Sequence, residues 1–86
     1  MILGKVFGTV ISTQKDPLLV GSKFMLVQHI ENDKLVDKFL VAVDAVGAGI
    51  GEKVLVATGS AARLALDNPD APVDASIVGI VDEKQG

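Results

Sequence analysis

Apolar residues occur along this chain in short runs that are separated by glycine, proline and polar residues, a pattern typical of β-strands. Gly4 and Gly8 interrupt the first run and predict bulges or sharp coiling there. The first run ends at Lys15-Asp16-Pro17, because proline has no amide hydrogen to donate and restricts the residue before it. We therefore expect five strands, at residues 2–13, 23–30, 35–46, 53–58 and 73–82.

One segment has a helical composition. Residues 59–66 are rich in alanine and leucine, so we expect one or two helical turns with Ser60 as the N-cap and an end at Asn68-Pro69. Short strands with one short α-helix before the last strand predict a mainly β fold, a small five-stranded OB-like barrel, although here the helix follows the fourth strand and not the third. Residues 1–86 are expected to form a single domain.

Several of the expected strands are apolar on both faces. In residues 53–58 two valines alternate with Leu55 and Ala57. The last strand carries on one side Val73, Ala75, Ile77 and Val81, and on the other side Val78 and Ile80. One face fills the barrel, and the other would form apolar patches, which monomeric proteins rarely expose. We therefore expect identical copies to cover these patches in a closed symmetric ring.

Charge and aromatic content argue against a nucleic-acid partner. The net charge is −3, and Phe7, Phe24 and Phe39 are the aromatic residues, which we expect in the core. The apolar runs are far shorter than the roughly 18–20 residues of a membrane-spanning helix, and no signal-peptide pattern opens the chain. We expect a cytoplasmic protein without a membrane partner. An OB-like binding module for a peptide or nucleic acid is the alternative function.

The sequence offers few groups for chemistry. It has no cysteine, and a nucleophile–base pair would have to combine a serine with the single histidine, His29. One histidine without a carboxylate cluster at ligand spacing does not build a metal site. The glycines of residues 47–51 precede a strand, so they predict a tight turn and not a dinucleotide-binding loop. We therefore expect no enzymatic activity and no cofactor.

Two acids, Asp44 and Asp74, lie inside apolar runs. A buried charge is costly unless it is paired or hydrogen-bonded, so either each acid caps a turn by accepting backbone amides, or one of them pairs with Arg63 across a subunit boundary. The turn glycines are expected to adopt positive φ angles, and a bulky residue at Gly49 is expected to impair folding. The candidate interface or turn residues are Asp44, Gly47, Gly49, Gly51, Val73, Asp74, Val78 and Ile80.

Four segments, taken in order, resemble one family. They are residues 12–24, residues 42–49, residues 54–63 with the motif Gly-Ser-Ala-Ala-Arg, and residues 72–82 with the motif Pro-Val-Asp-Ala. Each piece is short, but their order and spacing span nearly the whole chain. The chain is similar to the EutN/CcmL vertex proteins of bacterial microcompartment shells.

This resemblance implies a homopentamer, with a hexamer as the other subunit count, that caps the five-fold vertices of a shell tiled by hexameric shell proteins. It also implies a narrow axial pore, with Gly59, Ser60, Ala61, Ala62 and Arg63 as the candidate pore or axis residues. Because the chain ends at Gly86, before the C-terminal extension of many relatives, we expect a catabolic compartment and not a carboxysome. A ring-forming accessory subunit of an enzyme is a third possible function.

Overall fold

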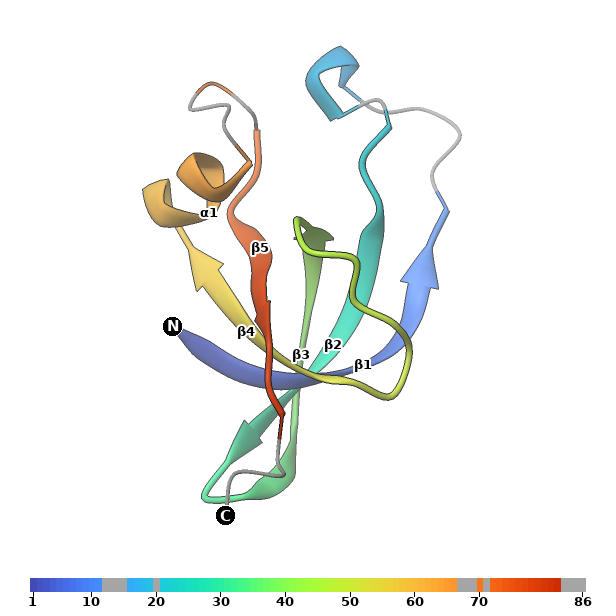
Figure 1. The fold of residues 1–86 in the computed structure, drawn as a ribbon, viewed down its shortest axis with the longest axis vertical. Helices are drawn as coiled ribbons and strands as arrows, with labels where there is room; N and C mark the ends of the chain where they lie inside the picture. The colour runs from blue at the N-terminus through green and yellow to red at the C-terminus, as the bar shows by residue number, and fades with distance from the viewer. Residues whose placement is uncertain (12–15, 20, 67–69, 71, 83–86) are drawn as a thin grey trace.

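The computed structural model describes residues 1–11, 16–19, 21–66, 70 and 72–82. Over these residues the chain forms a closed five-stranded barrel (Figure 1). In chain order the elements are β1 (Ile2–Val10), a 3-10 turn (Pro17–Leu19), β2 (Phe24–Glu31), β3 (Lys34–Asp44), β4 (Lys53–Thr58), α1 (Ser60–Ala65) and β5 (Ala75–Ile80).

The strands follow the order β1-β2-β3-β5-β4 around the barrel, and β4 pairs back to β1. The pairs are antiparallel except for β3 and β5, which run parallel through Val43–Ser76 and Asp44–Ile77. The expected mainly β, OB-like barrel with a helix before the last strand is confirmed. Strand ends differ slightly from those expected, and residues 12 and 13 lie outside the described part of the chain.

Every second side chain along a strand points into the barrel interior, because successive side chains of a strand point to opposite faces. β1 contains a bulge between Val6 and Gly8, which confirms the irregularity expected from the glycines of this run. The main core consists of Val6, Met25, Val27, Ala42, Ala48, Val54, Val56 and Ile77.

A second bulge changes the faces of β5. Ile77 pairs with Val56 and Gly79 pairs with Leu55, so Val78 is an extra residue with no partner of its own on β4. Beyond the bulge, Ile80 pairs with Val54, whose side chain is fully buried. The expectation that Ile80 lies on the face opposite Ile77 is therefore wrong, because the extra residue shifts the alternation by one position.

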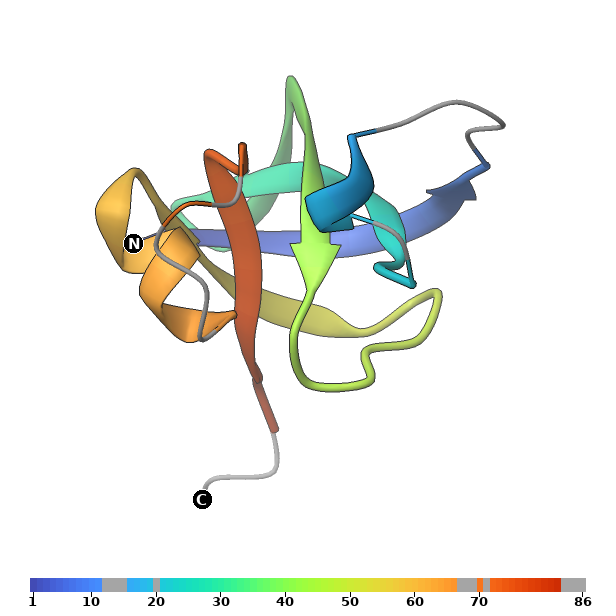
Figure 2. The same ribbon diagram turned by 90° about the horizontal axis from the view of Figure 1, so that it is seen from above.

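Helix α1 packs against β4 and β5 at one end of the barrel (Figure 2). Ala62 of this helix forms a second small core with Val43 and Val73. The N-cap is Gly59, with φ of 65°, and no side chain caps the helix, so the expectation of Ser60 as N-cap is wrong. Ser60 is instead the first residue of the helix. The N-cap position requires a backbone conformation that glycine alone adopts without strain, and Gly59 provides it.

Ser76 fixes the helix to the barrel. Its side chain is fully buried, and its hydroxyl donates a 2.9 Å hydrogen bond to the carbonyl of Ala62. Replacing Ser76 by alanine is expected to reduce the free energy of unfolding by about 1–3 kcal/mol, because the buried carbonyl loses its hydroxyl donor. Urea unfolding followed by circular dichroism measures the change, and an unaltered midpoint would contradict this role of the hydroxyl.

Two of the three phenylalanines lie on the surface. Phe7 is 47% exposed and Phe39 is 55% exposed, so the expectation that they are core residues is wrong for both. Their rings form an edge-to-face pair with centroids 5.7 Å apart. Phe24 is partly buried and packs against the second core, as expected.

The β2–β3 hairpin extends past the barrel, at the bottom of Figure 1. Its turn contains Asn32 and Asp33, both with positive φ, which confirms the polar turn expected at residues 31–34. An ion pair of 3.1 Å between Lys38 and Glu31 joins the two strands of the hairpin. The hairpin therefore forms an arm that carries side chains away from the barrel core.

Candidate interaction surfaces

The connection between β3 and β4 is organised by Asp44. One carboxylate oxygen accepts hydrogen bonds of 3.0 Å from the amides of Val46 and Gly47, and the other accepts a bond of 2.9 Å from the amide of Ala48. Of the two roles considered for Asp44, turn capping is therefore confirmed. The carboxylate fixes the loop that places Ala48 in the barrel core.

The glycines of this connection have different roles. Gly47 and Gly51 adopt φ of 83° and 92°, as expected, but Gly49 does not adopt a positive φ. The expectation for Gly49 is wrong, because this residue is held instead by a hydrogen bond from its amide to the Glu52 carboxylate. Gly51 donates a 2.7 Å hydrogen bond to the carbonyl of Val6, which ties the loop to β1.

Arg63 and Asp74 lie at the helix end of the barrel. The guanidinium of Arg63 donates a 3.0 Å hydrogen bond to the carbonyl of Val73. Asp74 is exposed, and its backbone carbonyl accepts a 3.0 Å bond from Gly59. Pairing of Asp74 with Arg63 across a subunit boundary stays a prediction.

The structure divides the candidate pore residues into two groups. Ser60 and Ala61 are exposed, and Gly59 and Arg63 are partly exposed, so these four stay candidates for the ring axis. Ala62 is on the inner side of α1, where it is fully buried within the protomer, so it cannot line a pore. The candidate interface residue Val73 is also buried within the protomer, whereas Ile80 is 44% exposed and Val78 is partly exposed.

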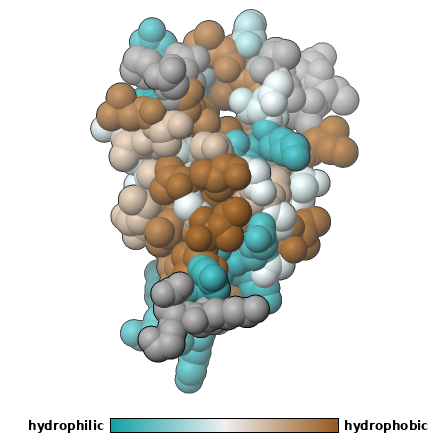
Figure 3. All heavy atoms as spheres, viewed as in Figure 1, coloured by the Kyte–Doolittle hydropathy of each residue, from teal (hydrophilic) through white to brown (hydrophobic). Residues whose placement is uncertain are grey.

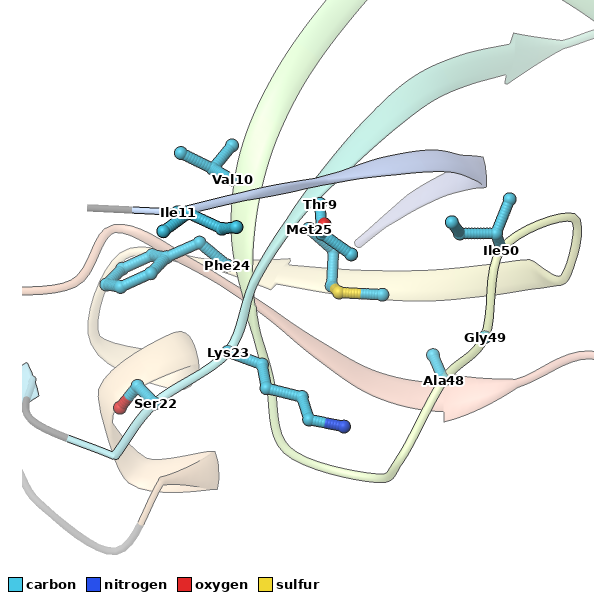
Figure 4. Close-up of a pocket in the computed structure, with 10 residues that line it drawn as sticks. All are labelled: Thr9, Val10, Ile11, Ser22, Lys23, Phe24, Met25, Ala48, Gly49 and Ile50. Atoms are coloured by element: carbon cyan, nitrogen blue, oxygen red, sulfur yellow. The ribbon is translucent and has the colours of Figure 1, made fainter. Parts of the chain in front are cut away.

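An apolar groove of about 470 Å³ opens beside the end of β1 (Figure 4). The start of β2 and the 48–50 segment form its other walls, and Lys23 is the charged residue among those that line it. A single ammonium group among aliphatic side chains gives no general acid–base pair. The groove is lined by Thr9, Val10, Ile11, Ser22, Lys23, Phe24, Met25, Ala48, Gly49 and Ile50.

The described residues contain no group of three or more histidine, cysteine or acidic side chains that could hold a metal ion. His29 lies in β2 opposite Gly4, and the hydroxyl of Ser76 is hydrogen-bonded to a backbone carbonyl. Within the described ranges, no helix has the length and apolar character that crossing a bilayer requires.

The surface instead presents hydrophobic residues. Figure 3 shows them in brown across the middle of the face that carries β5. Exposed apolar residues also occur on β1, β3 and β4, where they include Phe7, Leu35, Phe39, Val41 and Leu55. The two-faced apolar character expected from the sequence is therefore present on the folded protomer.

Comparison with known proteins places the chain in a family. The family model described as "Ethanolamine utilisation protein EutN/carboxysome" matches residues 1–82. The chain belongs to this EutN/CcmL family.

The relatives are shell proteins. The carboxysome shell vertex protein CcmL of Synechocystis sp. is 52% identical, over 95% of this chain and 83% of the relative. The bacterial microcompartment shell vertex protein PduN of Salmonella typhimurium is 45% identical, over 95% of this chain and 96% of the relative. The pentameric microcompartment shell protein GrpN of Rhodospirillum rubrum superposes with a TM-score of 0.86 at 44% identity, over 95% and 94% of the two chains.

The kind of compartment stays a prediction. The carboxysome protein of Synechocystis sp. is 52% identical to this chain, and the ethanolamine utilisation protein EutN is 39% identical. The expectation of a catabolic compartment is therefore not confirmed. The relatives named here are structural shell proteins, which does not favour the alternative of an OB-like binding module.

Proposed function

We propose that this chain is a structural subunit of a bacterial microcompartment shell, in the cytoplasm, and that it assembles into a pentamer that caps the five-fold vertices. The observation that carries the proposal is the membership of the chain in a family whose similar members include a pentameric shell protein of the same fold. The exposed apolar residues on several strands support it, since a ring would cover them.

The role at a vertex follows from geometry. A flat hexagonal layer cannot close into a shell without pentagonal units, so a five-fold ring with edges that fit hexameric shell proteins would introduce the curvature. This role requires no catalytic group of the chain. Hexameric shell proteins are the expected partners of the outer edge of the ring.

Native mass spectrometry of the purified chain at micromolar concentration tests the assembly. A complex of five copies is the expected result, and a stable monomer would count against the proposal. Co-expression with hexameric shell proteins tests the vertex role, because shells made without this chain are expected to stay open or elongated. Shells that close equally well in its absence would contradict capping.

Replacing Ile80 by aspartate is expected to convert the ring into monomers or aggregates. Ile80 is 44% exposed at the edge of the barrel, and an unpaired charge there would cost about 3–5 kcal/mol if a neighbouring copy covers it. Analytical ultracentrifugation measures the loss of the ring. Leu18→Asp, at a half-exposed leucine of the 3-10 turn, is the control and should leave the ring intact. An unchanged oligomer for Ile80→Asp would refute an interface at this position.

A further inference from the structure

The barrel is closed unevenly around its circumference. β1, β2 and β3 form one antiparallel part, and β4 and β5 form the other, with α1 packed against both of its strands (Figure 1). The two parts meet at four residue pairs between β1 and β4, but at two between β3 and β5. We call the pairing of Val43 with Ser76 and of Asp44 with Ile77 the seam. It is the shortest strand pairing among the described residues.

The packing beside the seam is incomplete. A hollow of about 350 Å³ is lined from one side by the end of β3, including Val43, and from the other side by residues 72–75, which lead into β5. Side chains that border unfilled space lose the contacts that a packed neighbour would provide. On the other side of the seam, a 3.2 Å hydrogen bond from the amide of Ala45 to the carbonyl of Ile77 adds one link. The seam therefore has little support on either side.

The buried side chains that join the two parts near the seam are few and small. Val43 of β3 packs with Ala62 of α1 and Val73 in the second core, which contains these three buried residues. The main core contains eight. Because hydrophobic stabilisation grows with the apolar area removed from water, the second core holds the two parts together less strongly than the main core does. Segments with few buried apolar contacts open at a lower free energy than the whole domain.

Helix α1 is attached to the chain that leads into β5. Three hydrogen bonds make this attachment, each between a donor and a backbone carbonyl. The donor and acceptor residues are Ser76 and Ala62 at 2.9 Å, Arg63 and Val73 at 3.0 Å, and Gly59 and Asp74 at 3.0 Å. All of these residues lie in the part of the barrel that contains β4 and β5. A displacement of β5 from β3 would therefore carry α1 with it.

We propose that the barrel opens locally at the seam, and that β4, α1 and β5 move away from β3 as one unit. The β1–β4 pairing acts as the hinge, and Ile77 stays in the barrel through its pairing with Val56 on β4. The unit contains residues 59–63, the candidates for the ring axis, so a closed seam holds this segment in position and an open seam releases it. Only this consequence for the axis rests on the proposed ring.

The reactivity of introduced cysteines tests the opening, because the chain has no cysteine of its own. Val43→Cys and Ala62→Cys place a thiol on the two sides of the second core, and Val27→Cys, at a fully buried position of β2, is the matched control. In the assembled protein, the first two thiols are expected to react with an aromatic disulfide reagent at rates within about threefold of each other. Both rates should exceed that of Val27→Cys by about 100-fold or more.

Hydrogen exchange of the wild-type chain distinguishes opening of the seam from lifting of the helix alone. The amide of Ala45 is bonded across the seam to Ile77, so it exchanges when the seam opens but stays protected when α1 alone leaves the barrel. Its exchange rate is expected to change little in low concentrations of urea, because local opening exposes little surface. Amides of the β1–β2 pairing should instead exchange faster as urea is added, because they require global unfolding. Mass spectrometry with fragmentation of the peptide chain measures single amides and needs no variant.

Three results would each contradict a different statement. Equally slow reaction of all three thiols, with the same urea dependence for the Ala45 amide as for the β1–β2 amides, would show that the seam opens only when the whole domain unfolds. Fast reaction of Val43→Cys and Ala62→Cys with a protected Ala45 amide would show that α1 moves without β5. A wild-type monomer in native mass spectrometry would overturn the proposed ring and its axis, while the thiol and amide rates would still decide whether the seam opens.

Discussion

Replacing Gly4 by alanine is expected to cause the largest loss of stability of any single methyl addition to the barrel, about 3 kcal/mol or more. Gly4 is buried where three strands meet, because it pairs with His29 on β2 and with Val54 on β4. A Cβ atom there would collide with Cγ1 of Val27 and lie 2.9 Å from the carbonyl oxygen of Gln28. A backbone carbonyl within a paired strand cannot move aside without disturbing the strand pairing.

Thermal unfolding at one fixed protein concentration measures this loss, since ring formation makes the midpoint depend on concentration. A decrease of more than about 10 °C is expected for a chain of this size. Gly79→Ala is the matched control, because a Cβ at Gly79 would make an ordinary contact of 3.7 Å with Leu55. If both variants unfold at the wild-type temperature, the close packing around Gly4 does not limit stability.

Replacing Asp44 by alanine is the second change with a large expected effect. The variant loses three charge-assisted hydrogen bonds to backbone amides, and the free energy of unfolding is expected to fall by about 3 kcal/mol. Asp44→Asn keeps a neutral acceptor and should lose about half as much. Urea unfolding with linear extrapolation measures both values.

Asp74 provides the control for Asp44, because it is the other acid that lies inside an apolar run. Asp74 is exposed, and it contributes its backbone carbonyl to the fold, so Asp74→Ala should change the free energy of unfolding by less than about 0.5 kcal/mol. Equal losses at the two positions would contradict the view that turn capping distinguishes Asp44.

The fold was predictable because the alternation of apolar and polar residues and the turn-forming residues determine structure within short segments of the chain. The strand positions, the polar turn before Lys34 and the helix before the last strand all follow from short segments. The bulge at Val78 was not predictable, because the number of residues facing β4 depends on pairing that alternation alone does not reveal. The exposure of Phe7 did have a signal in the sequence, because Phe7 follows the buried Val6 and lies two positions from the exposed Lys5.

The candidate surfaces were predicted less well than the fold. Ala62 and Val73 were candidates for the pore and the interface, but Ala62 is on the inner side of α1 and packs in the second core together with Val73, so both are buried. The opposition of Lys5 and Lys53 joins residues far apart in the chain, so it becomes visible only when the register of β1 and β4 is known. The exposed apolar residues Phe39 and Val41 of β3 had a signal in the sequence, their spacing of two along the strand.

The two pairings of β1 differ in when they arise during folding. β2 is the next strand after β1 in the chain, whereas β4 follows two strands later, so its pairing with β1 closes the barrel between distant segments. Contacts between distant segments form late, because loop closure is slow. An incompletely folded copy therefore leaves β1 and β4 with unpaired edges, which can pair with another chain until the barrel closes.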